Sequence, residues 1–285
     1  MNDDQRGFLA STGRVLGAAT CTALLFSVFL RVAVAEDVAA ILKHFVAVQQ
    51  ANDTEARQYT YLEHAEFSTY EADGVTFRKD RSEDSEIVFV EGLQFKKLLS
   101  RDGKPLDIRE QAEVEKQMNE TAAYRRSHRQ PAPGGKIAFG RDHADLGSNE
   151  ELLTLFDTRL AGEEGVRGRK AWVIEATPKN GLHAANEHQR DVVKFRKKLW
   201  IDETDFTLLK IVHTVVGSGM FAKPGTTVTL EYDRIPSGPY APVKIIVDIH
   251  RQVSGKIRPS GRTEYENSRF RKFDVQSTIA VGEPR

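Results

Sequence analysis

The sequence predicts a mainly β protein with helices (α+β), built on a curved antiparallel sheet. Three observations lead to this prediction. Segments of alternating apolar and polar residues recur between residues 58 and 273, turn residues separate most of them, and an amphipathic helical segment precedes the first one. A sheet of about ten strands tends to curl towards a barrel. We expect N-terminal and inserted helices to cover its concave side.

The N-terminus has the pattern of a secretory signal peptide. An uncharged apolar run, Val15–Leu30, follows a polar stretch containing Arg6 and Arg14, and the segment Ala33–Ala35 (AVA) is typical of a signal-peptidase site. Cleavage after Ala35 would leave residues 36–285 as a single periplasmic domain. The alternative is an uncleaved anchor in the inner membrane, because residues 15–35 are about long enough to cross a bilayer.

Composition excludes several classes of function. The only cysteine, Cys21, lies within residues 1–35, so the mature chain would hold neither a disulfide nor a thiolate metal site. The apolar run continues past Cys21, which argues against lipidation. Removing three arginines and two aspartates changes the 41 basic and 41 acidic residues to 38 and 39. No basic patch therefore indicates nucleic acid as a partner.

Two helices are predicted before the strand-rich C-terminal part. In Glu36–Gln50, apolar residues at spacings of three and four form one stripe, so this helix should lie on an apolar surface. Asp107 and Glu110 form a capping pair that begins a second helix, which runs to about His128. Between them, Gln58–Tyr70 alternates as a strand with one wet face, and further strands follow from Val75 to Leu99.

A third, short helix follows the capping box of Ser148 and Glu151, and the remainder is predicted to be β structure. Seven strands are expected in this part: residues 158–162, 170–177, 195–201, 207–216, 226–235, 243–253 and 262–273. In residues 208–216 apolar side chains occur at both even-numbered and odd-numbered positions. This strand should therefore be covered on both faces, and helices are expected to pack there. Trp172 and Trp200 lie in neighbouring strands, where they are able to pair across the sheet.

The order of these elements, with two motifs, resembles the LolA/LolB-like lipoprotein-carrier family. The motifs are Glu175–Lys179 (EATPK) and Leu199–Asp202 (LWID), which occupy the places of two successive strands in that family. The chain departs from the carriers in an insert over Leu182–Lys194. The resemblance implies an unclosed barrel with helices as a lid and an apolar cavity that holds acyl chains or another hydrophobic ligand.

We therefore expect a periplasmic carrier that binds acyl chains or a lipoprotein without chemistry. Parity and amphipathicity assign the following candidate wall residues: Phe45, Val228, Leu230, Tyr232, Val243, Ile245 and Val247. Met220 and Phe221, two apolar residues in a glycine-containing loop, are candidate rim contacts. The alternative is an envelope stress sensor or regulatory scaffold that binds a protein or lipid signal in the same groove, with an envelope membrane protein as partner.

No set of residues indicates catalysis, a metal or a cofactor. His183 and His188 lie five residues apart in a polar stretch, without the spacing of metal ligands. His143 follows Asp142 directly, and adjacent residues rarely face one another. Ser218 lies between strands and therefore lacks the strand-to-helix turn of a hydrolase nucleophile. We expect that the protein is not an enzyme.

Overall fold

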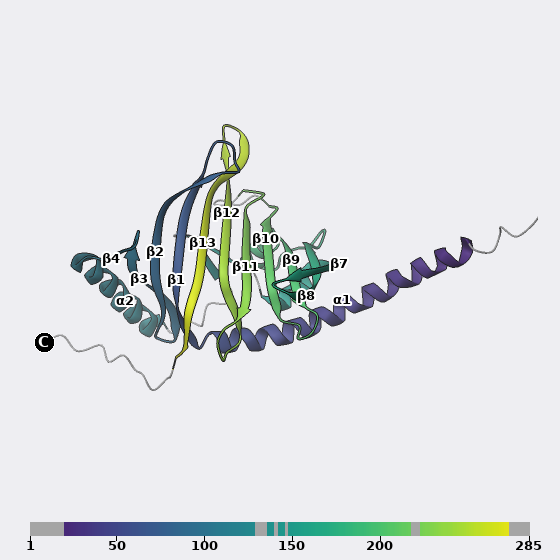
Figure 1. Ribbon diagram of the computed structural model, residues 1–285, viewed down its shortest axis with the longest axis horizontal. Helices are drawn as coiled ribbons and strands as arrows, with labels where there is room; N and C mark the ends of the chain where they lie inside the picture. The colour runs from purple at the N-terminus through teal and green to yellow at the C-terminus, as the bar shows by residue number, and fades with distance from the viewer. Residues whose placement is uncertain (1–19, 129–135, 140–141, 146–147, 218–222, 274–285) are drawn as a thin grey trace, which may run out of the picture.

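Eleven strands form one curved antiparallel sheet around which the protein is built (Figure 1). The structure is a computed structural model that describes residues 20–128, 136–139, 142–145, 148–217 and 223–273. The strands of the sheet are β1 (Tyr59–Tyr70), β2 (Phe77–Val90), β3 (Leu93–Arg101), β4 (Lys104–Pro105), β7 (Phe156–Val166), β8 (Arg169–Pro178), β9 (Phe195–Asp202), β10 (Leu208–Val215), β11 (Thr227–Arg234), β12 (Tyr240–Val253) and β13 (Lys256–Lys272). The other elements are α1 (Thr20–Ala56), α2 (Ile108–His128), α3 (Asn149–Leu155), α4 (Glu187–Val192) and a separate hairpin of β5 (Lys136–Phe139) and β6 (Asp142–Asp145).

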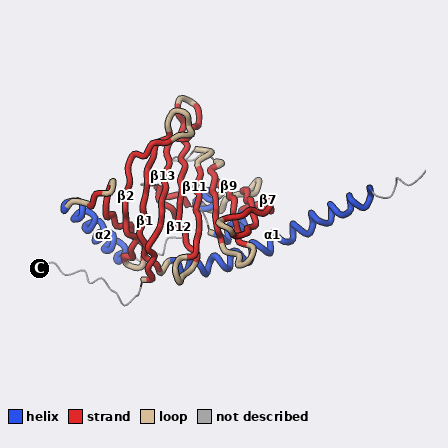
Figure 2. Tube along the Cα trace, in the orientation of Figure 1, coloured by secondary structure: helices blue, strands red, loops and turns tan. Residues whose placement is uncertain are grey.

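The strand order confirms an unclosed barrel. The sheet runs β4-β3-β2-β1-β13-β12-β11-β10-β9-β8-β7, so the first and last strands of the chain lie side by side in its middle. β4 and β7 are its two edges and do not pair with each other. The chain passes from one edge to the other through α2, the β5–β6 hairpin and α3. Figure 2 shows how strands dominate the body, with α1 along its base and α2 at one flank.

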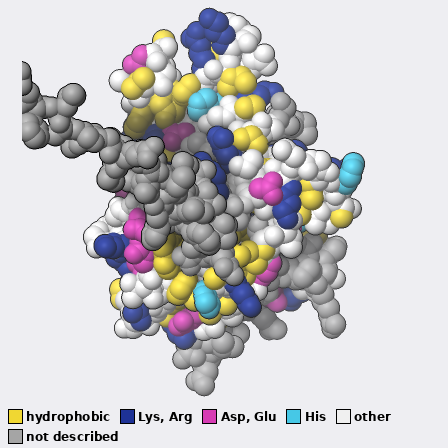
Figure 3. Space-filling view, turned by 90° about the vertical axis from the view of Figure 1, so that its right-hand side faces the viewer, with side chains coloured by type: hydrophobic (Ala, Val, Ile, Leu, Met, Phe, Trp, Pro, Cys, Tyr) yellow, Lys and Arg dark blue, Asp and Glu magenta, His cyan; other side chains and the backbone are white. Residues whose placement is uncertain are grey.

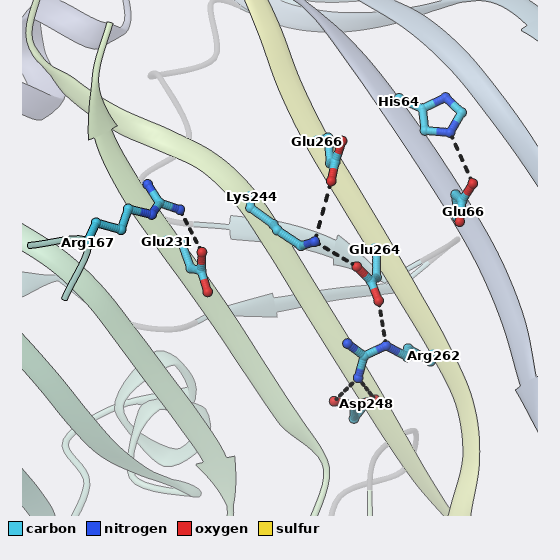
Figure 4. Close-up of polar contacts among 9 residues, drawn as sticks. All are labelled: His64, Glu66, Arg167, Glu231, Lys244, Asp248, Arg262, Glu264 and Glu266. Carbon is cyan, nitrogen blue, oxygen red and sulfur yellow. Dashed lines mark hydrogen bonds and ion pairs between the residues drawn. The ribbon is translucent and has the colours of Figure 1, made fainter. Parts of the chain in front are cut away.

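Irregular register explains how the sheet curls. Seven of its ten strand pairings contain a shift of register, including Thr60/Leu62 in β1 and Ile249/His250 in β12. An extra residue in one strand bends that strand and increases its right-handed twist. The sheet consequently has an inner face, which carries Val228 and Val247, and an outer face, which carries Lys244 and Arg262 (Figure 4).

Helix α1 packs on the inner face with the stripe that the sequence predicts. Val38, Ile41, Leu42 and Phe45 are all buried. The helix is longer than expected, because it begins at Thr20 and ends at Ala56, and its N-terminal part projects away from the sheet (Figure 1). Among the described residues, none of the helices combines the length and apolar character needed to cross a membrane.

Both predicted capping boxes are present. The Asp107 carboxylate accepts a hydrogen bond from the Glu110 amide at 2.8 Å, and the Ser148 hydroxyl and the Glu151 carboxylate cap each other's backbone amides at the start of α3. α3 buries Leu152 and Leu155 beside α1. α2 lies along β2 and β3, where Arg125 donates hydrogen bonds to three backbone carbonyls.

β10 is covered on both faces, as predicted, and a helix, α1, covers the inner one. Its inner residues, Leu208, Ile211 and Val215, join the cluster under α1. Leu209 and Val212 instead pack on the outer face with Trp200, whose indole is held by Glu164 at 2.7 Å. Trp172 and Trp200 do not pair, because Trp172 lies opposite Ile201 and the two indoles therefore occupy different faces.

Candidate functional site

The inner face brings most of the predicted wall residues together. Val228 lies opposite Val247, and Leu230 lies opposite Ile245 in the next pair of the β11–β12 ladder. Phe45 of α1 belongs to the same cluster and is fully buried. These side chains share one face because residues directly opposite each other across a ladder point the same way.

A β-bulge at Val243 gives the two remaining wall candidates, Tyr232 and Val243, different surroundings. Glu231 pairs with Lys244 whereas Tyr232 pairs with Pro242, so Val243 has no partner on β11. Tyr232 packs against the cluster, but Val243 is half-buried outside it. Simple alternation along β12 fails at this point because one extra residue reverses which face the next side chain meets. The rim candidates Met220 and Phe221 lie outside the described residues.

Helix α1 fills the space above these strands. Leu42 and Phe45 are at most 1% exposed, and they meet a floor that includes Ile201, Leu208 and Val228. Two shallow depressions on the described surface lie along α2, one beside Ile108 and one beside Tyr124. In this arrangement, the predicted wall residues of β11 and β12, apart from Val243, lie in or against the cluster that α1 covers.

The C-terminal end of α1 adds a buried polar group that the sequence analysis missed. Gln49 is 1% exposed and donates a hydrogen bond to Asp53 at 2.8 Å. Burial raises the pKa of Asp53, although Gln49 and Arg57 oppose the change. Burial also raises the pKa of Tyr232, with the charge of Asp53 as a second cause. The signal for this group was the continuation of the buried stripe past Phe45 to position 49.

Two titratable groups lie within the apolar inner face further along the sheet. Lys197 and His213 are paired across β9 and β10, and both are buried. Burial lowers the pKa of His213 well below its usual value, and the charge of Lys197 lowers it further. The ring of Phe195 meets His213 edge-on, and Lys197 Nζ lies 4.9 Å from the centre of the Phe156 ring. The signal available in the sequence was their position: Lys197 and His213 fall two residues from apolar side chains that point to the inner face.

The inner face continues beyond α1 as an aromatic surface on β1, β2 and β13. Tyr61, Phe67, Phe89 and Tyr265 are half-buried here. Phe67 and Tyr265 meet edge-on at 6.4 Å between ring centres, while Tyr61 packs on Phe270 at 5.1 Å. Burial, together with Glu63 and Glu83, raises the pKa of Tyr265 to about 12.

Cations border this aromatic surface. The guanidinium of Arg81 lies 3.8 Å from the centre of the Phe67 ring, and Lys96 Nζ lies 5.4 Å from that of Tyr265. Lys96 also pairs with Glu63 at 2.7 Å. A cation over a ring face is attracted by the quadrupole of the ring, so these contacts orient the aromatic side chains. The surface thus combines apolar area with fixed charges at its margin.

The outer face of the same strands is a network of ion pairs (Figure 4). Arg262 holds Asp248 through two contacts at 2.9 and 3.0 Å and Glu264 at 2.7 Å, while Lys244 joins Glu264 to Glu266. These residues alternate with the apolar residues of the inner face. Such alternation is expected of an antiparallel sheet with one face in water.

One group of histidine, acid and serine lies on the outer face, but its geometry does not suit nucleophilic catalysis. His64 and Ser100 both contact Asp84, with His64 Nδ1 at 2.6 Å from its carboxylate. The serine therefore donates to the acid, and the imidazole is not placed to remove its proton. Within the described part of the chain, no three His, Cys, Asp or Glu side chains gather to hold a metal ion.

Comparison with known proteins returns solved structures of low identity. No family model matches the chain, and no curated protein matches it. A DUF1329 family protein from Desulfovibrio piger aligns over 86% of this chain and 97% of its own, with 15% identity and a TM-score of 0.39. A LolA superfamily protein from Nitrosomonas europaea aligns over 80% of this chain and 94% of its own, with 12% identity and a TM-score of 0.35.

A chain of the MucA/MucB complex from Pseudomonas aeruginosa aligns over 81% of this chain and 93% of its own, with 14% identity and a TM-score of 0.24. Because these TM-scores lie below 0.5, the fold assignment rests on the strand order and the function on the chain's own geometry.

Proposed function

We propose that this protein is exported to the periplasm, loses residues 1–35, and as one domain of residues 36–285 binds acyl chains or another hydrophobic ligand without a chemical step. The observation that carries the proposal is the inner face of the sheet. It is apolar under α1 and continues beyond the helix as an aromatic surface whose side chains stay partly exposed. Exposed apolar surface of this kind is typical of binding sites.

The ligand would lie along Tyr61, Phe67 and Tyr265, beside α1. In this position it would continue the apolar cluster that Phe45 and Leu230 already form, and Val228, Ile245 and Val247 would become its floor if α1 moved aside. A cargo lipoprotein would leave its protein part in water. No catalytic residue is required, because transfer out of water supplies the affinity.

The magnitude is sufficient for tight binding. Each buried methylene contributes about 0.8 kcal/mol, so a sixteen-carbon chain would gain on the order of 10 kcal/mol before the cost of immobilising it. Aromatic walls suit such a chain, because flat rings offer contact area with little loss of side-chain entropy. Arg81 and Lys96, at the margin, would lie near an anionic head group.

Native mass spectrometry of the protein purified from a bacterial periplasm, followed by lipid extraction, tests this proposal. We expect a lipid-sized mass that is lost on denaturation. Phe67→Glu places a charge on the aromatic surface and should abolish the adduct. Ser68→Glu, one residue along the same strand and on the outer face, should keep it.

Both variants must first show cooperative unfolding, so that loss of the adduct is not loss of the fold. The proposal is wrong if the folded wild-type protein carries no lipid and takes up neither added fatty acid nor lipopeptide. A regulatory scaffold that recognises a protein partner would then be the better explanation.

A further inference from the structure

Two neighbouring hairpins project beyond the rest of the sheet (Figure 1), and each carries exposed apolar side chains. The β1–β2 turn carries Val75, 76% exposed, and Phe77, 47% exposed. The β12–β13 turn carries Val253, 50% exposed, and Ile257, 46% exposed. We call residues 71–77 and 251–258 together the hairpin tip.

The tip also carries cations without described partners. Arg251, Lys256 and Arg258 are all exposed, and none of them forms an ion pair with a residue that the structure describes. Residues 251–258 contain no acid, whereas the β1–β2 turn carries two. Glu71 pairs with Arg78, and the Asp73 carboxylate accepts hydrogen bonds from the backbone amides of Val75 and Thr76. Figure 3, which keeps the vertical axis of Figure 1, shows Lys and Arg side chains close to hydrophobic ones at the top of the molecule.

The register places two of these cations against each other. Arg251 lies directly opposite Arg258 in the β12–β13 ladder. Like charges at directly opposed positions destabilise a pair of strands. An anion that binds between them would remove this repulsion, so the arrangement favours an anionic partner.

The root of the tip is held in place. The Arg262 guanidinium lies 5.2 Å from the centre of the Phe77 ring and forms an ion pair with Asp248. Asp248 also accepts a hydrogen bond from the Tyr70 hydroxyl. The β1–β2 turn rests on β13, since a Cβ at Gly74 would lie 3.7 Å from Pro259. Ser254 and Gly255 both have positive φ, 49° and 77°, as in the tight two-residue turns that match strand twist. The two apolar ends therefore point outwards together.

We propose that the hairpin tip docks the protein on an anionic lipid bilayer, with the exposed side chains of Val75, Val253 and Ile257 entering the interface and the three cations meeting head groups. A narrow projecting tip suits insertion between lipids better than a protein contact, which usually buries about 800 Å² per partner. Combined apolar and basic residues are the features that hold proteins at membrane surfaces. Docking does not require a ligand on the inner face.

Vesicle binding tests the charge requirement. We expect the chain to sediment with phosphatidylglycerol-containing vesicles and much less with pure phosphatidylcholine. Each cation near the surface contributes about fivefold, so Arg251→Gln/Lys256→Gln/Arg258→Gln should weaken binding on the order of a hundredfold. Lys104→Gln/Arg109→Gln/Lys116→Gln removes the same charge from exposed positions around the start of α2 and should change it little.

A fluorescent label reports insertion directly. Cys21 is the single cysteine of the sequence, so Cys21→Ser removes the native thiol. Adding Val75→Cys or Ile257→Cys then gives the chain one thiol, at the tip, whether or not residues 1–35 are removed. An environment-sensitive dye there should shift to the blue with anionic vesicles, whereas a dye at Ile108→Cys, an exposed apolar position on α2, should not.

The proposal would be overturned if the two charge variants lost vesicle binding equally. It would also be overturned if anionic vesicles without protein left the emission of dyes at the tip unchanged. Dyes that respond only to vesicles carrying envelope proteins would also overturn it, and would assign the tip to a protein partner.

Discussion

Two histidines of this protein occupy opposite environments. His64 lies on the outer face between Asp84 and Glu66, and its hydrogen bond to Asp84 is the main cause that raises its pKa. His213 lies on the inner face beside Lys197, and burial lowers its pKa. The two residues should therefore give opposite dependences of stability on pH.

Replacing His64 by Gln should cost stability mainly at acidic pH. The raised folded pKa means that the imidazolium is favoured in the native state, so its contribution is full below the unfolded pKa of 6.5 and disappears as pH rises through the folded value. Because the side chain is 41% exposed, the effect should be small. Urea unfolding at about pH 5 and about pH 8 measures it. An equal loss at both values would contradict the assignment, and His183→Gln, an exposed histidine, serves as control.

Replacing His213 by Leu should make the protein more resistant to acid. The native state holds His213 neutral, so stability is full above the unfolded pKa of 6.5 and falls as pH drops towards the lower folded value. The variant lacks this loss. Thermal melting across the same pH range tests the prediction, and it fails if wild type and variant lose stability in parallel between about pH 7 and about pH 5.

Among the elements, α1 has the largest share in covering the sheet. Its apolar stripe covers part of the inner face, and its C-terminal end places Gln49 and Asp53 beside Tyr232. Most of the stability of such a helix comes from packing rather than from its own propensity. The helix is thus both part of the core and the margin of the proposed ligand surface.

Truncating Phe45 to Ala should destabilise the protein by about 3–5 kcal/mol, because the fully buried ring leaves a cavity against Val228 and its neighbours. Lys43→Ala, on the exposed side of the same helix, should change stability by less than about 0.5 kcal/mol. Urea unfolding of both variants gives the comparison. A cost for Phe45→Ala below about 1 kcal/mol would mean that α1 does not pack as described.

At the scale of the whole molecule, the sheet has two real edges. β8 is paired on both sides, by β7 and β9, whereas β7 is paired only by β8. An unclosed barrel should therefore be held together least firmly at its margins.

Amide hydrogen exchange should follow this order. We expect the backbone amides in the C-terminal half of β7, residues 162–166, to exchange much faster than those of the paired residues 169–173 in β8. The reason is that β7 lacks a second partner strand. Mass spectrometry of peptides from the two strands measures both in one experiment. Equally slow exchange would indicate that another strand covers the edge in solution.

The sequence by itself determined the local elements. The α1 stripe, the two capping boxes and the alternation of β11 and of β12 beyond Val243 all appear where periodicity and capping chemistry place them. These features depend on neighbours within a few residues, so a single sequence contains them. The mainly antiparallel class follows from the same alternation, whereas the unclosed barrel was implied by the resemblance to the LolA/LolB-like carriers.

Only the tertiary structure decided which segments meet. The pairing of β1 with β13, the bulge that removes Val243 from the cluster, and the burial of Lys197 beside His213 depend on contacts far apart in the chain. The Arg251–Arg258 pair and its proximity to Val75 likewise need the register of two hairpins. Local patterns cannot specify these relations, because one inserted residue reverses every face that follows it.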